Sequence, residues 1–172
     1  MAICSLRPYE TGDAKSLWEA AHESVVEVGP WLAWCHAQYS VADAVEWIRS
    51  RAPLAAERRE YHFAILGTDG RFLGGCGINQ INRIHRFGNL GYWVRTSATG
   101  RGVATDAVRQ LAEFAFRNTD LLRLEILCAV GNERSQRVAE RASAVREGVL
   151  RNRLLLHGQP VEAVMYSLVR KA

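Results

Sequence analysis

A glycine-containing loop near the middle of the chain is the feature that most restricts how this sequence can fold. Residues 87–95 alternate in character as a strand does, and apolar side chains recur at helical spacing from residue 103 onward. The intervening residues 96–102 contain Gly100 and Gly102. Because a helix N-terminus has unpaired N–H groups and glycines let backbone approach a ligand closely, this unit predicts an anion-binding loop.

The loop matches neither of two familiar phosphate-binding patterns. The dinucleotide fingerprint needs G-x-G-x-x-G, and the P-loop ends in Gly-Lys-Ser or Gly-Lys-Thr, whereas this segment reads Thr99-Gly100-Arg101-Gly102-Val103-Ala104. A tight turn into a helix with no ligand fits these residues equally well. The loop alone therefore leaves its function open.

Length and composition limit the class of protein. The chain has 172 residues, with 48% hydrophobic and 23% charged, which is typical of one globular domain; we expect a single domain over residues 1–172. No apolar run approaches the ~20 residues that span a bilayer. Residues 1–7 lack the basic and apolar layout of a signal peptide. We expect a cytoplasmic protein that does not bind a membrane.

Charge and metal-ligand spacing exclude further classes. The net charge of +4 suits an anionic ligand but is too small and too evenly spread to indicate direct binding of nucleic acid. The cysteines are scattered without a CxxC pair, and the histidines show no HxH or HxxxH spacing. We expect no metal, and we expect Cys4, Cys76 and Cys128 to be buried thiols in strands.

The order of predicted elements indicates an α+β domain. A helix over residues 11–28 follows a first strand and ends at Gly29-Pro30, and a second helix opens at Ser40 with Asp43 in a capping-box-like arrangement. The predicted strands cover residues 3–7, 61–66, 71–78, 87–95, 123–129, 145–156 and 161–169, and two later helices begin near residues 103 and 132.

Several separate blocks of the sequence, in this order, resemble the GNAT acetyltransferases, and within them the RimJ/RimL-like branch that acetylates ribosomal-protein N-termini. The resemblance runs almost end to end. The blocks are Leu6-Arg7-Pro8, Trp31-Leu32-Ala33-Trp34, Asn89-Leu90-Gly91-Tyr92-Trp93-Val94, Gly100-Arg101-Gly102-Val103-Ala104-Thr105, Arg123-Leu124-Glu125-Ile126, Asn132-Glu133-Arg134-Ser135, Val138-Ala139-Glu140 and Arg146-Glu147-Gly148-Val149-Leu150-Arg151.

The resemblance implies a mixed, twisted sheet of about seven strands flanked by about four helices, with residues 87–95 splayed from residues 123–129 to leave a V-shaped cleft. It implies acetyl-CoA as co-substrate and no metal. The pantetheine arm would pair with backbone of Trp93, Val94 and Arg95 as an added strand does. The resemblance also implies that the loop and the first residues of the following helix bind the cofactor, with the pyrophosphate on their amides. These residues are Gly100, Arg101, Gly102, Val103, Ala104 and Thr105.

Asn132 and Ser135 match the family's second motif. The resemblance implies that Asn132 bonds the pantetheine and that Ser135 is catalytic, donating a proton to the departing thiolate. From the residues alone, Asn132 is equally a favoured helix N-cap and Ser135 an ordinary polar position. Arg95, Arg101, Arg134 and Arg137 could neutralise phosphates, or could be solvated surface arginines.

The sequence departs from the family pattern in three places. Thr99 stands where the loop usually begins with Gln or Arg, which puts cofactor affinity in doubt. Asn89 stands where many relatives have Glu, and an amide cannot act as a general base. Residues 141–145 lack the usual glycine and aromatic, which predicts a local repacking.

The Asn89 change bears on the acceptor. An α-amino group titrates near 7.7–8.0 and a lysine side chain near 10.4, so a site without a strong base suits a peptide N-terminus. Water leading to Glu125 or Glu133 could still carry the proton. The expected acceptor-binding residues are Trp31, Trp34, His36 and Asn89, although both tryptophans could instead fill the core.

Two other interpretations stay open at this stage. The first is transfer to a small amine such as an antibiotic or polyamine. The second is a non-catalytic acyl-CoA-binding sensor, which Thr99 and Asn89 would permit. Relatives in the family are monomers or homodimers, and the sequence does not distinguish these states.

Overall fold

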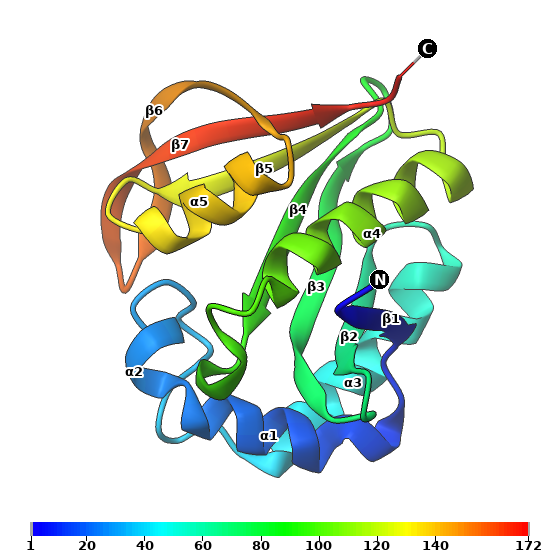
Figure 1. Ribbon diagram of the computed structural model, residues 1–172, viewed down its shortest axis with the longest axis vertical. Coiled ribbons are helices and arrows are strands. Elements are labelled where there is room, and N and C mark those ends of the chain that lie inside the picture. Colours follow the sequence, from blue (N-terminus) through cyan, green and yellow to red (C-terminus); the bar gives the residue numbers. More distant parts are fainter. Residues whose placement is uncertain (1, 172) are drawn as a thin grey trace.

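Seven strands form one mixed sheet in the order β1-β2-β3-β4-β5-β7-β6 (Figure 1). The structure is a computed structural model that describes residues 2–171. The strands are β1 (Cys4–Pro8), β2 (Tyr61–Gly67), β3 (Phe72–Asn82), β4 (Phe87–Val94), β5 (Arg123–Ala129), β6 (Val145–Leu156) and β7 (Gln159–Val169). This sheet confirms the expected α+β class and the expected number of strands.

In this described part of the chain, five α-helices accompany the sheet, one more than expected. They are α1 (Ala14–Glu23), α2 (Val25–Val28), α3 (Val41–Ala56), α4 (Val103–Asn118) and α5 (Glu133–Arg141), with short 3-10 turns η1 (Thr11–Asp13) and η2 (Thr96–Ala98). The capping box predicted at the start of α3 is present, because Ser40 accepts from the amide of Asp43 and the Asp43 side chain accepts from the amide of Ser40.

The extra helix arises at Ser24, where the single helix predicted over residues 11–28 was wrong. The buried Ser24 hydroxyl donates to the carbonyl of Ala20 at 2.7 Å and accepts from the amide of Thr96 at 3.0 Å. A serine that bonds back to the preceding turn competes with the helical hydrogen bonds. The chain therefore stops α1 at Glu23 and restarts as α2, while Ser24 anchors the segment that follows β4.

The helices cover the two faces of the sheet, each over its own apolar cluster (Figure 1). Helices α4 and α5 pack on the face that carries Leu90, Leu124 and Ile126, and the larger cluster lies there. Helices α1 and α3 pack on the opposite face against Ala64 and Phe72. Side chains along β4 thus point alternately to two faces of the sheet. Helices α4 and α5 cover one face, and α1 and α3 cover the first three strands on the other.

Strands β4 and β5 are neighbours for only a short distance. Their parallel pairing joins Phe87 with Arg123, Gly88 with Leu124 and Asn89 with Glu125, and ends there. Beyond this point β4 continues to pair with β3 and β5 with β7, so the facing edges of β4 and β5 separate (Figure 1). The splayed central pair expected from the sequence is confirmed.

The cysteine prediction is also confirmed: Cys4, Cys76 and Cys128 are buried, free and in strands, and Cys35 is likewise buried and free. Within residues 2–171, no three His, Cys, Asp or Glu side chains gather closely enough to hold a metal ion. None of the helices in this described part of the chain is both long and apolar enough to cross a membrane.

Candidate active site

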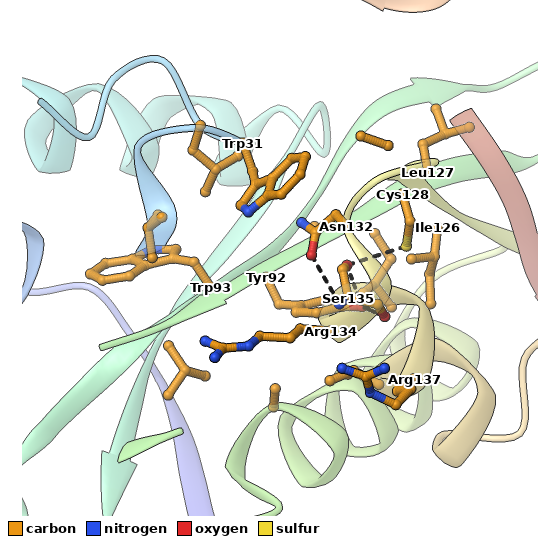
Figure 2. Close-up of a pocket in the computed structure, with 18 of the residues that line it drawn as sticks. Trp31, Tyr92, Trp93, Ile126, Leu127, Cys128, Asn132, Arg134, Ser135 and Arg137 are labelled. Carbon is orange, nitrogen blue, oxygen red and sulfur yellow. Dashed lines mark hydrogen bonds between the residues drawn. The ribbon is translucent and has the colours of Figure 1, made fainter. Parts of the chain in front are cut away.

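A cavity of about 630 Å³ occupies the gap between the separated ends of β4 and β5 (Figure 2). Every residue from Asn89 to Val94 and every residue from Ile126 to Ala129 contributes to its lining. Because successive side chains of a strand point to opposite faces, a cavity lined by consecutive residues of both strands reaches both faces of the sheet. It therefore passes through the sheet.

Two groups of residues on other elements add to the lining of the cavity. One, which we call the helix wall, comes from the loop before α4 and from the start of α5: Thr99, Gly100, Gly102, Val103, Ala104, Thr105, Asn132 and Ser135. The other, the hairpin wall, comes from the segment after α2 and from β6: Trp31, Leu32, Arg153, Leu154 and Leu156. The two walls have different chemistry, and we describe the helix wall first.

The start of α4 presents unpartnered backbone donors to the cavity. The first bond of the helix runs from the amide of Asp106 to the carbonyl of Gly102 at 3.0 Å, and no side chain caps the helix. Within residues 2–171, the amides of Val103, Ala104 and Thr105 have no hydrogen-bond acceptor. Free amides at a positive helix end are the donors that a pyrophosphate needs, so these residues fit such a group.

Glycine is required at the bend before α4. Gly100 and Gly102 have φ angles of 75° and 81°, a left-handed conformation that side chains with a Cβ disfavour. At Gly102 a Cβ would also lie 3.0 Å from Cδ1 of Ile3. The sequence pattern Gly-x-Gly thus sets the path by which the chain turns from β4 into the helix with its amides exposed.

Two arginines expected beside this site lie elsewhere. Arg95 is 8% exposed, and its guanidinium bonds the carboxylate of Glu23, with Nε at 2.8 Å from Oε2, and the carbonyl of Phe72 at 3.1 Å. Arg95 and Arg101 are both absent from the cavity lining, whereas Arg134 and Arg137 of α5 belong to it (Figure 2). Arg95 is occupied with joining α1 to β4.

Ser135 lies in a small polar cluster at the start of α5 (Figure 2). Its hydroxyl is 3.0 Å from the Tyr92 hydroxyl and 3.2 Å from Sγ of Cys128, and the Tyr92 hydroxyl donates to the Ser135 carbonyl at 2.8 Å. Burial raises the pKa of Tyr92 well above its ordinary value, and burial also raises the pKa of the Cys128 thiol. All three groups are therefore protonated at neutral pH.

The sequence interpretation missed Tyr92 and Cys128 as partners of Ser135. The signal was present in the alternation of the two strands, which places Tyr92 with Leu90 and Cys128 with Ile126 on the face that α5 covers. The sequence does not show how α5 packs on the sheet, and this packing brings Ser135 to these two side chains.

Asn132 acts as the N-cap of α5. Its Oδ1 accepts from the amide of Ser135 at 3.1 Å, which is the capping role open to asparagine at this position. The side chain also lines the cavity, and in residues 2–171 no acceptor is bonded to its Nδ2 (Figure 2). One amide oxygen thus holds the helix while the amide nitrogen is free to donate into the cavity.

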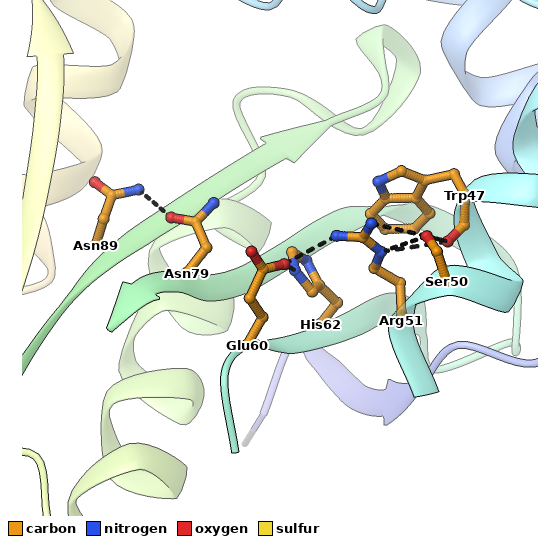
Figure 3. A network of polar contacts seen from close by, with 7 residues as sticks. All are labelled: Trp47, Ser50, Arg51, Glu60, His62, Asn79 and Asn89. Atoms are coloured by element: carbon orange, nitrogen blue, oxygen red, sulfur yellow. Dashed lines mark hydrogen bonds and ion pairs between the residues drawn. The ribbon is translucent and has the colours of Figure 1, made fainter. Parts of the chain in front are cut away.

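On the other face of β4, Asn89 is held by a neighbour on β3. Its Nδ2 donates to Oδ1 of Asn79 at 2.9 Å, across a directly opposed pair of strand residues (Figure 3). This bond leaves Oδ1 of Asn89 as the acceptor at the cavity. Two residues further along β4, a Cβ on Gly91 would meet no atom within 4 Å, so the strand is open there.

The two tryptophans of the segment after α2 have different surroundings. Trp31 lines the cavity (Figure 2), and its ring edge lies 3.5 Å from the position a Cβ would take on Gly131. Trp34 instead packs edge-on against Trp93 and Tyr39, with ring centroids 5.2 and 5.3 Å apart. Neither Trp34 nor His36 lines the cavity, and His36 lies edge-on to Tyr39.

A second polar network lies beyond Asn79, outside the cavity lining (Figure 3). Oε2 of Glu60 is 2.8 Å from Nε2 of His62 and 2.9 Å from Nη1 of Arg51, whose guanidinium stands over the Trp47 ring. Burial is the largest influence on His62 and lowers its pKa. These contacts fasten α3 to β2.

Comparison with known proteins assigns the family. The family model described as "Acetyltransferase (GNAT) domain" matches residues 4–145. The chain belongs to the GNAT acetyltransferases. A GNAT relative from Bacillus subtilis (strain 168), "Putative ribosomal N-acetyltransferase YdaF", is 31% identical over 97% of this chain and 91% of its own. The "Ribosomal-protein-serine acetyltransferase" of Escherichia coli (strain K12) is 25% identical over 80% of this chain and 76% of its own length.

Solved GNAT structures agree with the fold. A crystal structure described as a "Probable acetyltransferase" has a TM-score of 0.89 at 29% identity, covering 99% of this chain and 94% of that one. The microcin C7 self-immunity acetyltransferase MccE, in complex with acetyl-CoA and AMP, has a TM-score of 0.90 at 22% identity, covering 99% and 94%. The relatives whose names refer to ribosomal acetyltransferases confirm the resemblance to the RimJ/RimL-like GNAT branch.

Proposed function

We propose that this GNAT acetyltransferase transfers the acetyl group of acetyl-CoA directly to the N-terminal amine of a protein or peptide. The observation that carries the proposal is the Ser135 hydroxyl, held against Tyr92 inside a cavity that also contains the free amides of α4. We assign residues 1–172 to this single activity and place it in the cytoplasm, where the ribosomal proteins named for its relatives occur.

The helix wall would hold the co-substrate. The amides of Val103, Ala104 and Thr105 fit the pyrophosphate, and the free edge of β4 at Trp93 and Val94 offers backbone groups for the pantetheine arm. Nδ2 of Asn132 adds a donor on the same side. MccE binds acetyl-CoA on the same fold, which supports this placement without fixing individual contacts.

Ser135 would supply the proton that the reaction needs on the sulfur side. When the amine nitrogen forms its bond to the thioester carbonyl, the carbon–sulfur bond breaks and the thiolate takes a proton. Because the Tyr92 hydroxyl donates its one hydrogen to the Ser135 carbonyl, Ser135 is the donor in the contact between the two hydroxyls, and its hydrogen would turn from Tyr92 to the sulfur as the thiolate forms. Tyr92 thus acts by holding Ser135 in place.

The amine side lacks a strong base. Asn89 offers a carbonyl oxygen that can orient an amine but cannot take its proton. At pH 7 roughly a tenth of α-amino groups are already neutral, against fewer than about one in a thousand lysine side chains. The site therefore favours a peptide N-terminus, with water as the route by which the proton leaves.

The test is to measure release of the CoA thiol with N-terminal peptides, lysine peptides whose N-termini are blocked, and small polyamines. We expect turnover on free N-termini. The Ser135→Ala variant should lose about 100-fold in kcat with little change in the KM of acetyl-CoA, because a positioned general acid contributes about that factor. Ser5→Ala, on the exposed face of β1, is the matched control and should retain wild-type turnover.

Three results would contradict the proposed activity, and a fourth would contradict the role of Ser135. Equal rates on blocked lysine peptides would remove the α-amine preference, and faster turnover of polyamines would favour a small-molecule acceptor. Tight acetyl-CoA binding without transfer to any amine would make the protein a sensor. Wild-type turnover by Ser135→Ala would remove that residue from the acid role while leaving the activity in place.

A further inference from the structure

The charges around the cavity are strongly one-sided. The charged residues in its lining are Glu27, Arg134, Arg137, Arg141 and Arg153. Arg134, Arg137 and Arg141 share one face of α5 because they are three and four residues apart. This face lies beside the helix wall. Glu27 accepts from the Thr96 hydroxyl at 2.9 Å and so has a partner next to η2. Arg153 alone stands on β6.

The contacts of the β6–β7 hairpin place Arg153 on the hairpin wall. Nε2 of His157, at the tip of the hairpin, is 2.9 Å from the carbonyl oxygen of Gly29, two residues before Trp31. The neighbours Leu154 and Leu156 line the cavity together with Trp31 and Leu32. Arg153 is thus part of the hairpin wall, together with Trp31 and Leu32, where the acceptor would lie.

Arg153 has no counterion in the described part of the chain. Its side chain is exposed, and within residues 2–171 it forms no salt bridge or hydrogen bond. The carboxylates that pair with arginines elsewhere, such as Glu23, Glu60 and Glu147, are bonded to other residues. The hairpin wall therefore brings one positive charge, and no negative charge, to the cavity.

We infer that Arg153 selects acceptors that carry acidic side chains within the first few residues after the reactive amine. This inference rests on the proposed function and names the class of peptide that this site takes. A carboxylate on the acceptor would form an ion pair with the guanidinium, which suits the planar geometry of arginine. The same positive charge also disfavours the protonated amine, which helps a site without a strong base.

The experiment compares two peptides that begin with serine and differ at residues 2–4, which are all glutamate or all lysine. The measured quantity is the ratio of kcat/KM for the acidic peptide to kcat/KM for the basic one. We expect the wild type to favour the acidic peptide and Arg153→Glu to lower the ratio roughly tenfold, since a partly exposed charge is worth a factor of several and reversal changes its sign. The KM of acetyl-CoA should stay unchanged.

Arg151→Glu is the matched control. Arg151 is an exposed arginine of the same strand that does not line the cavity, so its reversal changes the net charge equally. We expect its ratio to stay within about twofold of the wild type, and added salt to weaken the wild-type preference. Thermal unfolding of each variant checks that the hairpin is intact.

Two results would overturn the inference about Arg153 and leave the proposed function intact. One is a ratio that is the same in the wild type, Arg153→Glu and Arg151→Glu, and the other is a wild-type preference for the lysine peptide. A wild type that binds acetyl-CoA and acetylates neither peptide would overturn the proposed function as well, so the two failures are distinguishable.

Discussion

The two walls of the cavity are built in different ways. The helix wall consists of two local units, which are residues 99–105 without Arg101 and the pair Asn132 and Ser135. Its donors are mainly backbone amides that any sequence with the right glycines can present. The hairpin wall joins residues 31–32 to residues 153–156, and its character depends entirely on side chains.

This difference separates what the enzyme shares with its family from what is particular to it. A wall made of backbone changes little while the loop conformation is kept, so it suits a substrate common to all members. A wall made of side chains on two remote segments can change by single substitutions. The comparison implies that damage to the helix wall removes activity in general, whereas damage to the hairpin wall changes which acceptor is used.

The largest expected effect comes from breaking the helix wall at Gly102. A Gly102→Val substitution forces a β-branched residue to a φ of 81° and brings its Cβ to 3.0 Å from Ile3 Cδ1. We expect the KM of acetyl-CoA to rise about 100-fold, because displacing the amides loses several charge-assisted hydrogen bonds. Steady-state kinetics with acetyl-CoA varied is the measurement.

Gly70→Val is the control for backbone strain. Gly70 has a φ of 78° in the turn between β2 and β3, and a Cβ there would meet nothing within 4 Å. It should lose a similar amount of stability while keeping the KM of acetyl-CoA. An equal rise in KM for both variants would show that the loop geometry at Gly102 is not specific to binding.

An intermediate effect separates the two tryptophans after α2. Trp34→Ala removes a ring that packs on Trp93 and Tyr39 and should lower the free energy of unfolding by about 3 kcal/mol, as other aromatic truncations in packed sites do. Trp31→Ala should cost less stability and raise the KM of the peptide about tenfold, because it removes the aromatic ring from the hairpin wall. Urea unfolding and peptide kinetics on both variants test this, and the reverse assignment of the two effects would contradict it.

The smallest expected effect concerns the join between α1 and β4. The bonds from Arg95 and from Ser97 hold the pKa of Glu23 at about 2, against an ordinary value of 4.5. A carboxyl whose folded pKa is depressed stabilises the fold at high pH, and this contribution is lost as pH falls through the window from about 4.5 to about 2.

The Glu23→Gln variant tests that contribution. It should be less stable than the wild type at pH 7, and the difference should shrink as pH falls through the same window. Urea unfolding at a series of pH values gives the measurement. A difference that does not change with pH would show that the ionised form of Glu23 is not what stabilises the join.

Most of the fold could be predicted because its signals are local. The alternation in β4, the turn at residues 68–70 and the capping box at Ser40 each depend on a few neighbouring residues. The break at Ser24 was missed, because a serine that bonds back to the preceding turn need not end a helix, and the amide that fixes this hydroxyl belongs to Thr96, far away in sequence. The same distance hid the role of Arg95, whose partner Glu23 lies on α1.

The candidate site also has a part that could be predicted from the sequence and a part that could not. Gly100 and Gly102 were identified from a local pattern, Asn132 and Ser135 from the resemblance to the family, and the structure brings all four to one cavity. Trp31 and Trp34 could not be told apart, because an irregular segment has no periodicity from which a direction can be read. The bond from Asn79 to Asn89 depends on the register of β3 with β4, and the segment of β6 that carries Arg153 contains a register shift between Leu150 and Leu154.

The passage of the cavity through the sheet has a consequence for the order of events. Because Asn89, Gly91 and Trp93 line it from one face and Leu90, Tyr92 and Val94 from the other, two molecules can occupy it end to end. Co-substrate and acceptor would then be bound at the same time and would meet inside the sheet. Turnover should therefore proceed through a complex of the enzyme with both substrates, and initial-rate lines with both substrates varied should intersect and not run parallel.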